Sequence, residues 1–344
     1  MHYINRYAIG LILLTAALCG AAAAQKSKPK PRPSPVPVPV TTPMPTPLPM
    51  PTPTPTPTKE QIIEDVDAGA KTYIETFKNL IADETKTFEM YGKNGEVKKK
   101  RVVRSSFIVF PLMKAEGQVV EFRNVTSVDD KKIGDSDKRA NDLIEKLSSA
   151  ETSEAELERL RDESSRHDLD IAISGMTLYQ ALAVDKELRE FFEFSIRPAP
   201  AGSSTITIDY RQVKDSPDIT VNSTTSRPVG RAGLNYDIDI DKEMPMTARV
   251  SGTIVVDAAT FKIISESRNV SVQPAGFASP ATVVEDRFAY QDGAFGIFTP
   301  KLITHTQYMV STRDMRAVKQ LKVTFEYGNF SRPGVDVKAD EVKQ

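Results

Sequence analysis

TARVSGTIVVDAATFKIISESRNVSV, residues 247–272, is the stretch that decides the fold. Its two runs rich in β-branched residues, 253–256 and 261–264, are separated by a short polar sequence that begins at Asp257. This pattern is typical of a β-hairpin, in which the Asp257 side chain can cap the turn. Because most of the other predicted strands flank this hairpin, we expect it at the centre of one large antiparallel sheet.

Alternating apolar and polar residues predict strands on both sides of the hairpin. The expected strands cover residues 85–91, 96–110, 118–123, 205–211, 236–241, 283–291, 302–310 and 319–327, with a small hairpin at 125–133. Asn94 and Gly95 form the tight turn between the first two. After residue 204 we find no helical pattern between the strands, so they should be joined as antiparallel hairpins.

The strand expected at 96–110 begins with a basic run, Lys-Lys-Lys-Arg at 98–101. A run of this kind is usually a solvated strand edge that blocks edge-to-edge pairing. Contact with a phosphate or a lipid headgroup is the alternative.

Helical periodicity precedes the first strand and returns in the middle of the chain. Thr58 and Gln61 form a capping box that opens a helix, and its apolar stripe continues to Ile81. We expect this stripe to pack on the sheet. A helical insertion is expected at about 135–195. Its predicted helices lie at 140–147, 153–160 and 177–192, and Pro198 and Pro200 end the region.

The N-terminal residues differ in composition from the rest of the chain. Residues 1–24 combine a basic start, an apolar core too short for a comfortable membrane span and a run of alanines, which predicts a secretory signal cleaved after Ala24. Lipidation at Cys19 and retention as an anchor are the alternatives. The prolines at 25–58 prevent the packing of a core and favour an extended, disordered linker.

A single domain is expected at residues 59–335, followed by a polar tail at 336–344. The first 58 residues hold five of the 45 Lys and Arg and none of the 46 Asp and Glu, so the remainder has 40 basic against 46 acidic residues, a net charge of −6. A mildly acidic domain argues against nucleic acid as a partner. Because Cys19 is the single cysteine, the processed chain must derive its stability from its core rather than from disulfides.

Residues with catalytic or metal-binding potential are few. Outside the signal the histidines are His167, interpreted as the polar end of a helix, and His305, interpreted as a satisfied or solvent-facing strand residue. Residues 237–241 begin like a calcium loop, but Lys242 and Ala248 stand where that loop needs glycine and glutamate, so we interpret them as a polar strand or turn. We therefore predict a protein that is not an enzyme and has no cofactor and no metal site.

Three groups of residues carry a resemblance to a known family. They are VEFRNV at 120–125 with VDD at 128–130, SGTIVVD at 251–257 with FKI at 261–263, and FEYGNF at 325–330. With its leading helix, strand pairs, helical insertion and long β half, the chain resembles secreted bacterial proteins of the lipoprotein-carrier (LolA/LolB-like) fold. The resemblance implies an α+β fold, in which a large curved antiparallel sheet, an incomplete barrel, packs against amphipathic helices and encloses an apolar cavity for acyl chains.

This chain departs from those carriers in its proline-rich segment, its longer helical insertion and its lack of tryptophan. We expect a non-catalytic periplasmic, secreted or cell-surface protein, without a membrane span after signal removal, that binds a lipid or a lipidated protein in the half-barrel. The candidates to line that site are Phe107, Phe122, Ile208, Tyr210, Phe288, Val323 and Phe325. The alternative is an interaction or sensor module that binds an envelope protein through the face or edge of the sheet.

Overall fold

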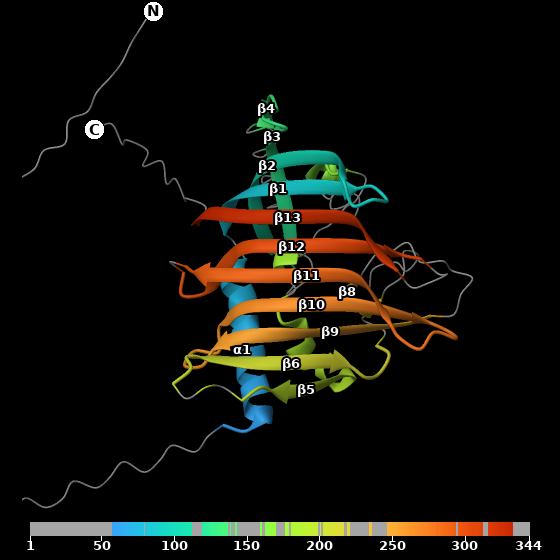
Figure 1. Ribbon diagram of the computed structural model, residues 1–344. Helices are drawn as coiled ribbons and strands as arrows, with labels where there is room; N and C mark the ends of the chain where they lie inside the picture. Colours follow the sequence, from blue (N-terminus) through green and yellow to red (C-terminus); the bar gives the residue numbers. More distant parts are fainter. Residues whose placement is uncertain are drawn as a thin grey trace, which may run out of the picture. The chain divides into compact units, whose positions relative to one another are not determined.

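The computed structural model describes residues 57–332 apart from 79, 112–118, 137, 139–141, 143–158, 160–161, 170–175, 179, 199, 201, 217–218, 221–233, 236–245, 294 and 312–315. Within these residues, eleven strands form one sheet in which every neighbouring pair is antiparallel (Figure 1). In sheet order the strands are β4 (Lys131–Lys132), β3 (Val119–Val128), β2 (Val97–Pro111), β1 (Ile81–Tyr91), β13 (Ala317–Ser331), β12 (Phe298–Val310), β11 (Ala281–Asp292), β10 (Ile263–Pro274), β9 (Met246–Asp257), β6 (Thr205–Gln212) and β5 (Phe192–Ile196). A separate parallel pair consists of β7 (Ile219–Thr220) and β8 (Leu234–Asn235).

The hairpin predicted from residues 247–272 is confirmed as β9 and β10. Val256 lies opposite Ile263 at the turn, and Val250 lies opposite Val270 further along. Asp257 caps the turn as expected, because its Oδ1 accepts hydrogen bonds from the backbone N–H of Thr260 at 2.8 Å and from the Thr260 hydroxyl at 2.7 Å.

The expected central position of this hairpin is wrong. The β9–β10 pair has β6 and β5 on one side and seven strands on the other, so β12 occupies the middle of the sheet. The reason is the pairing of β1 with β13, in which Phe88 lies opposite Val323 and Lys86 opposite Phe325. This pairing joins the first and last strands of the domain. Because those strands are far apart in the chain, no local sequence pattern predicts that they pair.

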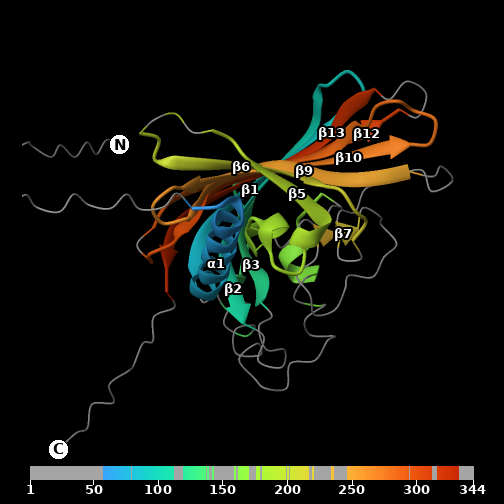
Figure 2. The same ribbon diagram turned by 90° about the horizontal axis from the view of Figure 1, so that it is seen from below.

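The first predicted helix is confirmed as α1 (Lys59–Phe77), with the Thr58 hydroxyl accepting a hydrogen bond from the Gln61 N–H at 3.2 Å. It ends four residues before the predicted Ile81, which begins β1 instead, because Lys78 adopts an extended conformation. The buried residues of α1 are Ile62, Ile63, Val66, Asp67, Ala70, Tyr73 and Phe77. They pack on one face of the sheet, which we call the inner face, and β2 and β3 turn towards the helix on that side (Figure 2).

The helix predicted at 177–192 is wrong. Its residues form three short 3-10 turns, η1 (Met176–Leu178), η2 (Leu182–Val184) and η3 (Arg189–Phe191), and the strand β5 follows directly. Ala181 has a left-handed backbone with φ of 48°, which interrupts a helix, and the N–H groups of Thr177 and Ala181 donate to carboxylates of the sheet rather than to helical carbonyls. The strand predicted at 236–241 lies outside the described residues, and so do the helices predicted at 140–147 and 153–160 except for residues 142 and 159.

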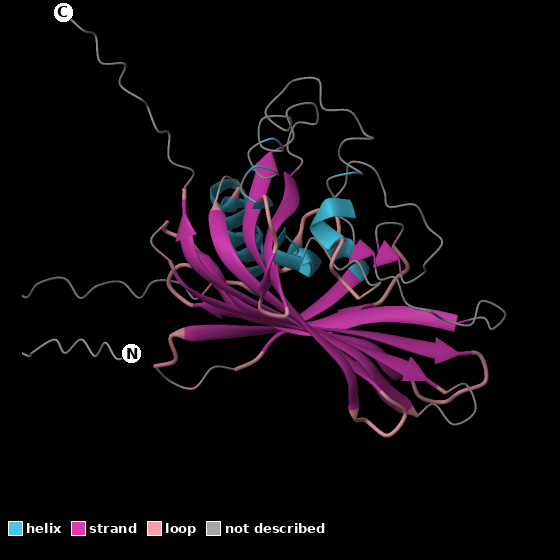
Figure 3. Ribbon diagram, turned by 90° about the horizontal axis from the view of Figure 1, so that it is seen from above, coloured by secondary structure: helices cyan, strands magenta, loops and turns pink. Residues whose placement is uncertain are grey.

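Residues 162–169, 176–178 and 180–191, which we call the covering segment, lie on the inner face beside α1 (Figure 2). The other face of the sheet is not covered by any helix in the part of the chain that the structure describes (Figure 3). This outer face is polar in the middle of the sheet, where Thr87, Thr324 and Thr304 lie side by side across β1, β13 and β12. The large antiparallel sheet is thus confirmed, while the described helical layer consists of α1 and short turns.

The small hairpin predicted at 125–133 and the solvated basic edge are both confirmed. Asp129 and Asp130 form the turn between β3 and β4 with positive φ values of 47° and 63°. β3 pairs with β2 only from Val103 onward, so the side chains of residues 98–100 remain exposed on a free edge of β2.

Gly252 provides a test of the packing on the inner face. A Cβ at this position would lie 2.5 Å from Tyr210 Oη and closer still to the Ser267 carbonyl oxygen. We expect Gly252→Ala to lower the free energy of unfolding by about 2 kcal/mol through overpacking, as measured by urea denaturation. Gly328→Ala in β13 is the matched control, since its added methyl group meets nothing within 4 Å. Equal stability of the two variants would contradict this packing.

Candidate ligand site beneath the sheet

Charged side chains occupy the inner face of β1 and β3. Along β1, Glu84 and Lys86 alternate in phase with the buried Ala82 and Phe88, so strand geometry points both charges inward. Glu84 and Lys86 are each only 1% exposed. Burial of a charge is costly unless it is paired, so the partners of these groups determine the local structure.

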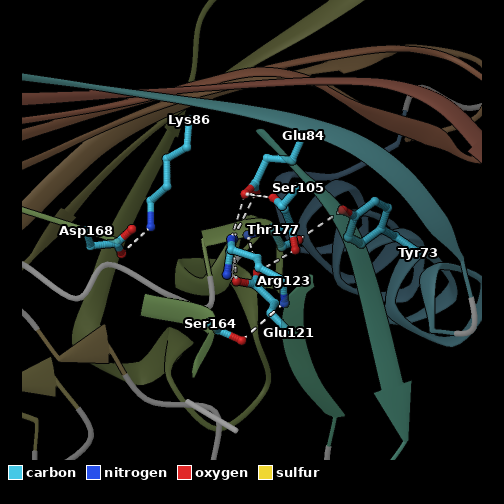
Figure 4. Close-up of polar contacts among 9 residues, drawn as sticks. All are labelled: Tyr73, Glu84, Lys86, Ser105, Glu121, Arg123, Ser164, Asp168 and Thr177. Carbon is cyan, nitrogen blue, oxygen red and sulfur yellow. Dashed lines mark hydrogen bonds and ion pairs between the residues drawn. The ribbon is translucent and has the colours of Figure 1, made fainter. Parts of the chain in front are cut away.

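Arg123 of β3 pairs with two carboxylates of the sheet (Figure 4). Its Nε donates to Glu84 Oε1 at 2.7 Å and its Nη2 to Glu84 Oε2 at 3.0 Å, a bidentate pair, while Nη2 also donates to Glu121 Oε2 at 3.1 Å. Burial by itself would raise the pKa of Glu84, but Arg123 and then Lys86 bring it below its ordinary value. Burial likewise opposes ionisation of Arg123, yet Glu84 and Glu121 raise its pKa well above the ordinary value. Both partners therefore favour their charged forms.

Lys86 meets a carboxylate that comes from the covering segment. Its Nζ lies 2.5 Å from Asp168 Oδ2, and it also lies over the rings of Phe88 and Phe325, at 5.0 Å and 5.3 Å from their centroids. Burial, followed by the charge of Arg123, lowers the pKa of Lys86. Burial also raises the pKa of Asp168. Both members of this pair are thus shifted towards their neutral forms, in contrast to Glu84 and Arg123.

The sheet carboxylates also hold the covering segment in place. Glu121 Oε1 accepts hydrogen bonds from the Thr177 N–H at 3.0 Å and the Thr177 hydroxyl at 2.6 Å, and Tyr73 of α1 donates to the Thr177 carbonyl at 2.9 Å (Figure 4). Further along the sheet, Glu266 Oε2 accepts from the Ala181 N–H at 2.8 Å. The segment is therefore attached through specific polar contacts as well as apolar packing.

A second buried polar cluster lies on β6, β10, β11 and β12. Glu266 Oε1 accepts from the Tyr210 hydroxyl at 2.8 Å and from Nη2 of Arg268 at 2.9 Å. On the neighbouring strands, His305 Nδ1 lies 2.6 Å from Asp286 Oδ1. His305 is 3% exposed, so the solvent-facing alternative is wrong and the satisfied one is confirmed for Nδ1.

A pocket of about 300 Å³, which we call the end pocket, opens between α1, the β9–β10 turn and the β11–β12 turn. Its lining residues are Asp65, Ala68, Gly69, Thr72, Tyr73, Gln180, Thr260, Phe261, Lys262, Ile263, Gly296, Ile297 and Phe298. Gly69 allows α1 to approach the hairpin closely, since a Cβ there would lie 3.1 Å from the Phe261 carbonyl oxygen. The buried Tyr73 and Gln180 form the inner part of the pocket, next to the covering segment.

The seven residues predicted from the sequence to line a ligand site are all buried, and none belongs to the end pocket. Six of them, Phe107, Ile208, Tyr210, Phe288, Val323 and Phe325, belong to the core on the inner face. Phe122 alternates with the inward Glu121 and Arg123 and lies across from Ile108, so it faces the other way.

Three of the predicted phenylalanines lie against buried cations. Besides Phe325 beneath Lys86, Phe107 lies 5.1 Å from the Arg123 guanidinium. Phe288 lies 5.0 Å from the guanidinium of Arg268. These cations, and the carboxylates that pair with them, were missed by sequence reasoning. A signal did exist, because Glu84 and Lys86, like Glu266 and Arg268, occupy the apolar phase of their strands.

The described parts of the chain contain no group of three or more His, Cys, Asp or Glu side chains placed to hold a metal ion. None of the helices described is long and apolar enough to cross a membrane.

Comparison with known proteins gives structural neighbours alone. No family model matches the sequence, and no curated protein matches it significantly. The structure is similar to a LolA superfamily protein from Nitrosomonas europaea, with 8% identity, coverage of 81% of this chain and 96% of that one, and a TM-score of 0.33. It is also similar to a domain described as outer membrane lipoprotein-sorting from Vibrio parahaemolyticus, with 11% identity, coverage of 78% and 94%, and a TM-score of 0.28. A third is a DUF1329 family protein from Desulfovibrio piger, with 10% identity, coverage of 80% and 92%, and a TM-score of 0.30.

Two of these structures carry the family names to which the sequence resemblance pointed. Every TM-score is below 0.5. The description of the fold therefore rests on the strand order and contacts of this chain itself.

Removal of each of the two ion pairs of the inner face should change the free energy of unfolding differently. Arg123→Met leaves Glu84 and Glu121 buried without their cation, so we expect the free energy of unfolding to fall by about 4 kcal/mol. Replacing both Lys86 and Asp168, as Lys86→Met with Asp168→Leu, should change it by no more than about 1 kcal/mol or raise it. Urea denaturation at pH 7 measures both. A larger loss in the double variant than in Arg123→Met would refute the distinction.

The pH dependence of stability should have opposite signs at Asp168 and Glu84. The raised pKa of Asp168 contributes stability that is present below the ordinary value of 3.8 and is lost as pH rises through the folded-state pKa. The lowered pKa of Glu84 contributes stability that is present above 4.5 and is lost as pH falls through the folded-state pKa. On acidification, wild type should therefore gain stability relative to Asp168→Asn and lose it relative to Glu84→Gln, as measured by urea midpoints at successive pH values. The same trend for both variants would disprove the assignment.

Proposed function

We propose that this protein is a non-catalytic binding protein of the periplasm or cell surface, which takes up an apolar or lipidated ligand beneath its sheet. The end pocket is the observation that carries this proposal. Its volume of about 300 Å³ is at the small end of the range of ligand sites, roughly 300–1,000 Å³.

The chemistry of the end pocket suits the end of an acyl chain. Phe261, Ile297 and Phe298 supply an apolar wall, and the polar lining residues are Asp65, Thr72, Gln180, Thr260 and Lys262. Phe261 and Phe298 are partly exposed, so their apolar surface is accessible to a ligand. A pocket that combines an apolar wall with convergent polar groups can hold a ligand that has an apolar and a polar part.

The inner part of the pocket connects it to the covering segment. Tyr73 lines the pocket and donates to the Thr177 carbonyl, and Gln180 lines it from the covering segment itself. A ligand longer than the pocket would have to displace these residues. The inward-facing candidates, among them Phe107, Phe288 and Phe325, would then contact the ligand.

The remaining features of the chain fit an envelope protein. We propose that residues 1–24 direct secretion and are removed after Ala24. The proline-rich residues 25–58, at about 3.1 Å per residue in polyproline II conformation, would then hold the domain on the order of 90 Å from an attachment point.

A second candidate function is an interaction module that binds an envelope protein. The observation that favours it is the polar face of the sheet, which no described helix covers, together with β5 at the end of the strand order (Figures 1 and 3). Such a module would bind a protein without taking up lipid.

Native mass spectrometry of residues 59–344 purified from a bacterial periplasm, followed by lipid extraction, tests the binding function. We expect a bound acyl species, or binding of a fluorescent fatty-acid probe by the apo protein. An apo mass together with no probe binding would exclude lipid binding and favour the interaction module.

Blocking the end pocket should weaken this binding. Thr72 lines the pocket from an exposed position on α1, so Thr72→Trp should fill the entrance and reduce probe affinity at least about fivefold. Glu75→Trp, also exposed on α1 but outside the pocket, is the matched control and should bind normally. The chain has no native tryptophan, so each variant also reports probe contact by its own fluorescence. Equal probe affinities of the two variants would show that the ligand does not enter through the end pocket.

A further inference from the structure

The two buried ion pairs of β1 differ in where their partners come from. Glu84 pairs with Arg123, and both belong to the sheet, so neither partner of this pair is supplied by the covering segment. Lys86 pairs with Asp168, which belongs to the covering segment (Figure 4). If the covering segment moves away to admit a ligand, Lys86 loses this carboxylate while the sheet pair remains intact.

The segment that carries Asp168 is attached to the sheet by hydrogen bonds and by the buried side chain of Leu169. Ser164 Oγ accepts from the Arg123 N–H at 3.1 Å, and the His167 carbonyl accepts from Arg101 Nη1 at 3.0 Å. The net contribution of a single hydrogen bond to stability is small, because folding exchanges bonds to water for bonds within the protein. These contacts can therefore be exchanged for contacts with water or with a ligand.

Lys86 places a cation against an apolar wall, and the charges of Glu84 and Arg123 also act on it. Phe88 and Phe325 lie directly beneath its ammonium group, and Val323 lies opposite Phe88 on β13. All three apolar side chains are completely buried. A molecule that combines a carboxylate with a hydrocarbon chain matches this arrangement, with the carboxylate in the place of Asp168 and the chain on the rings.

We propose that Lys86 is a ligand-binding residue that holds the carboxylate of a long-chain carboxylic acid, and that Asp168 occupies this position in the closed structure. The inference rests on the proposed function, because it assigns a ligand class to the same site beneath the sheet. The other inner-face cations are matched within the sheet: Arg123 by Glu84 and Glu121, and Arg268 by Glu266.

The electrostatics of the closed state favour such an exchange. The pKa of Lys86 is lowered and that of Asp168 is raised, both first through burial, so their mutual attraction offsets only part of the cost of desolvation. A ligand carboxylate at Lys86 would return Asp168 to water and preserve an ion pair for the ammonium group. Glu84 and Arg123 show the opposite shifts, so the sheet pair has no such tendency to exchange.

Oleate and oleyl alcohol, which share a chain and differ in the acid group, test the proposal on the mature chain. We expect Lys86→Met to lower the affinity for oleate at least about tenfold and to change the affinity for oleyl alcohol less than about twofold, in calorimetric titrations. Lys86→Arg keeps the charge and should retain most of the oleate affinity. Asp168→Asn removes the competing carboxylate, so it should bind oleate more tightly than wild type, an effect that a merely structural role does not produce.

Lys262 at the end pocket is the matched lysine control. Loss of the preference for oleate in Lys262→Met but not in Lys86→Met would place the acid group at the pocket and overturn the inference. Equal loss of both ligands in Lys86→Met and Asp168→Asn would also overturn it, while leaving the proposed function intact. Absence of binding of either ligand to wild type would instead refute the proposed function itself.

Discussion

Buried charge on the inner face of the sheet is the constraint on which the rest of this structure depends. Glu84, Glu121 and Glu266 lie at positions of their strands where an ordinary sheet would carry apolar side chains. Each has to accept hydrogen bonds from something nearby, because water is excluded there. Arg123 and Arg268 satisfy part of this need, and the backbone of the covering segment satisfies another part.

This constraint explains the conformation of the covering segment. The N–H groups of Thr177 and Ala181 donate to Glu121 and Glu266, so the chain follows the carboxylates of the sheet in short 3-10 turns rather than its own helical pattern. Arg189 Nη2, which bonds Asp67 Oδ2 of α1 at 2.9 Å, fixes the far end of the same segment. The inner face is thus closed by these polar contacts together with buried apolar side chains of the same segment, among them Leu169, Leu182 and Leu188.

The two faces of the sheet differ in their chemistry. The inner face combines phenylalanine rings with cations, and it is adjacent to the end pocket through Tyr73 and Thr177. The outer face presents aligned threonines across β1, β13 and β12, a surface compatible with water. Binding of an apolar molecule beneath the sheet and exposure of the sheet to solvent are therefore compatible within one antiparallel architecture.

The sequence by itself determined the local elements: the β9–β10 hairpin with its Asp257 cap, α1 with its Thr58 cap, and the burial of the predicted phenylalanines. These depend on residues close together in the chain, whose periodicity and turn chemistry are readable directly. The tertiary structure alone decided the β1–β13 pairing, the end pocket and the partners of Glu84, Lys86 and Glu121. A charge in the apolar phase of a strand signals that a partner must exist. The partner itself, such as Asp168 for Lys86, lies 82 positions away and is selected by packing across the sheet, which no local pattern encodes.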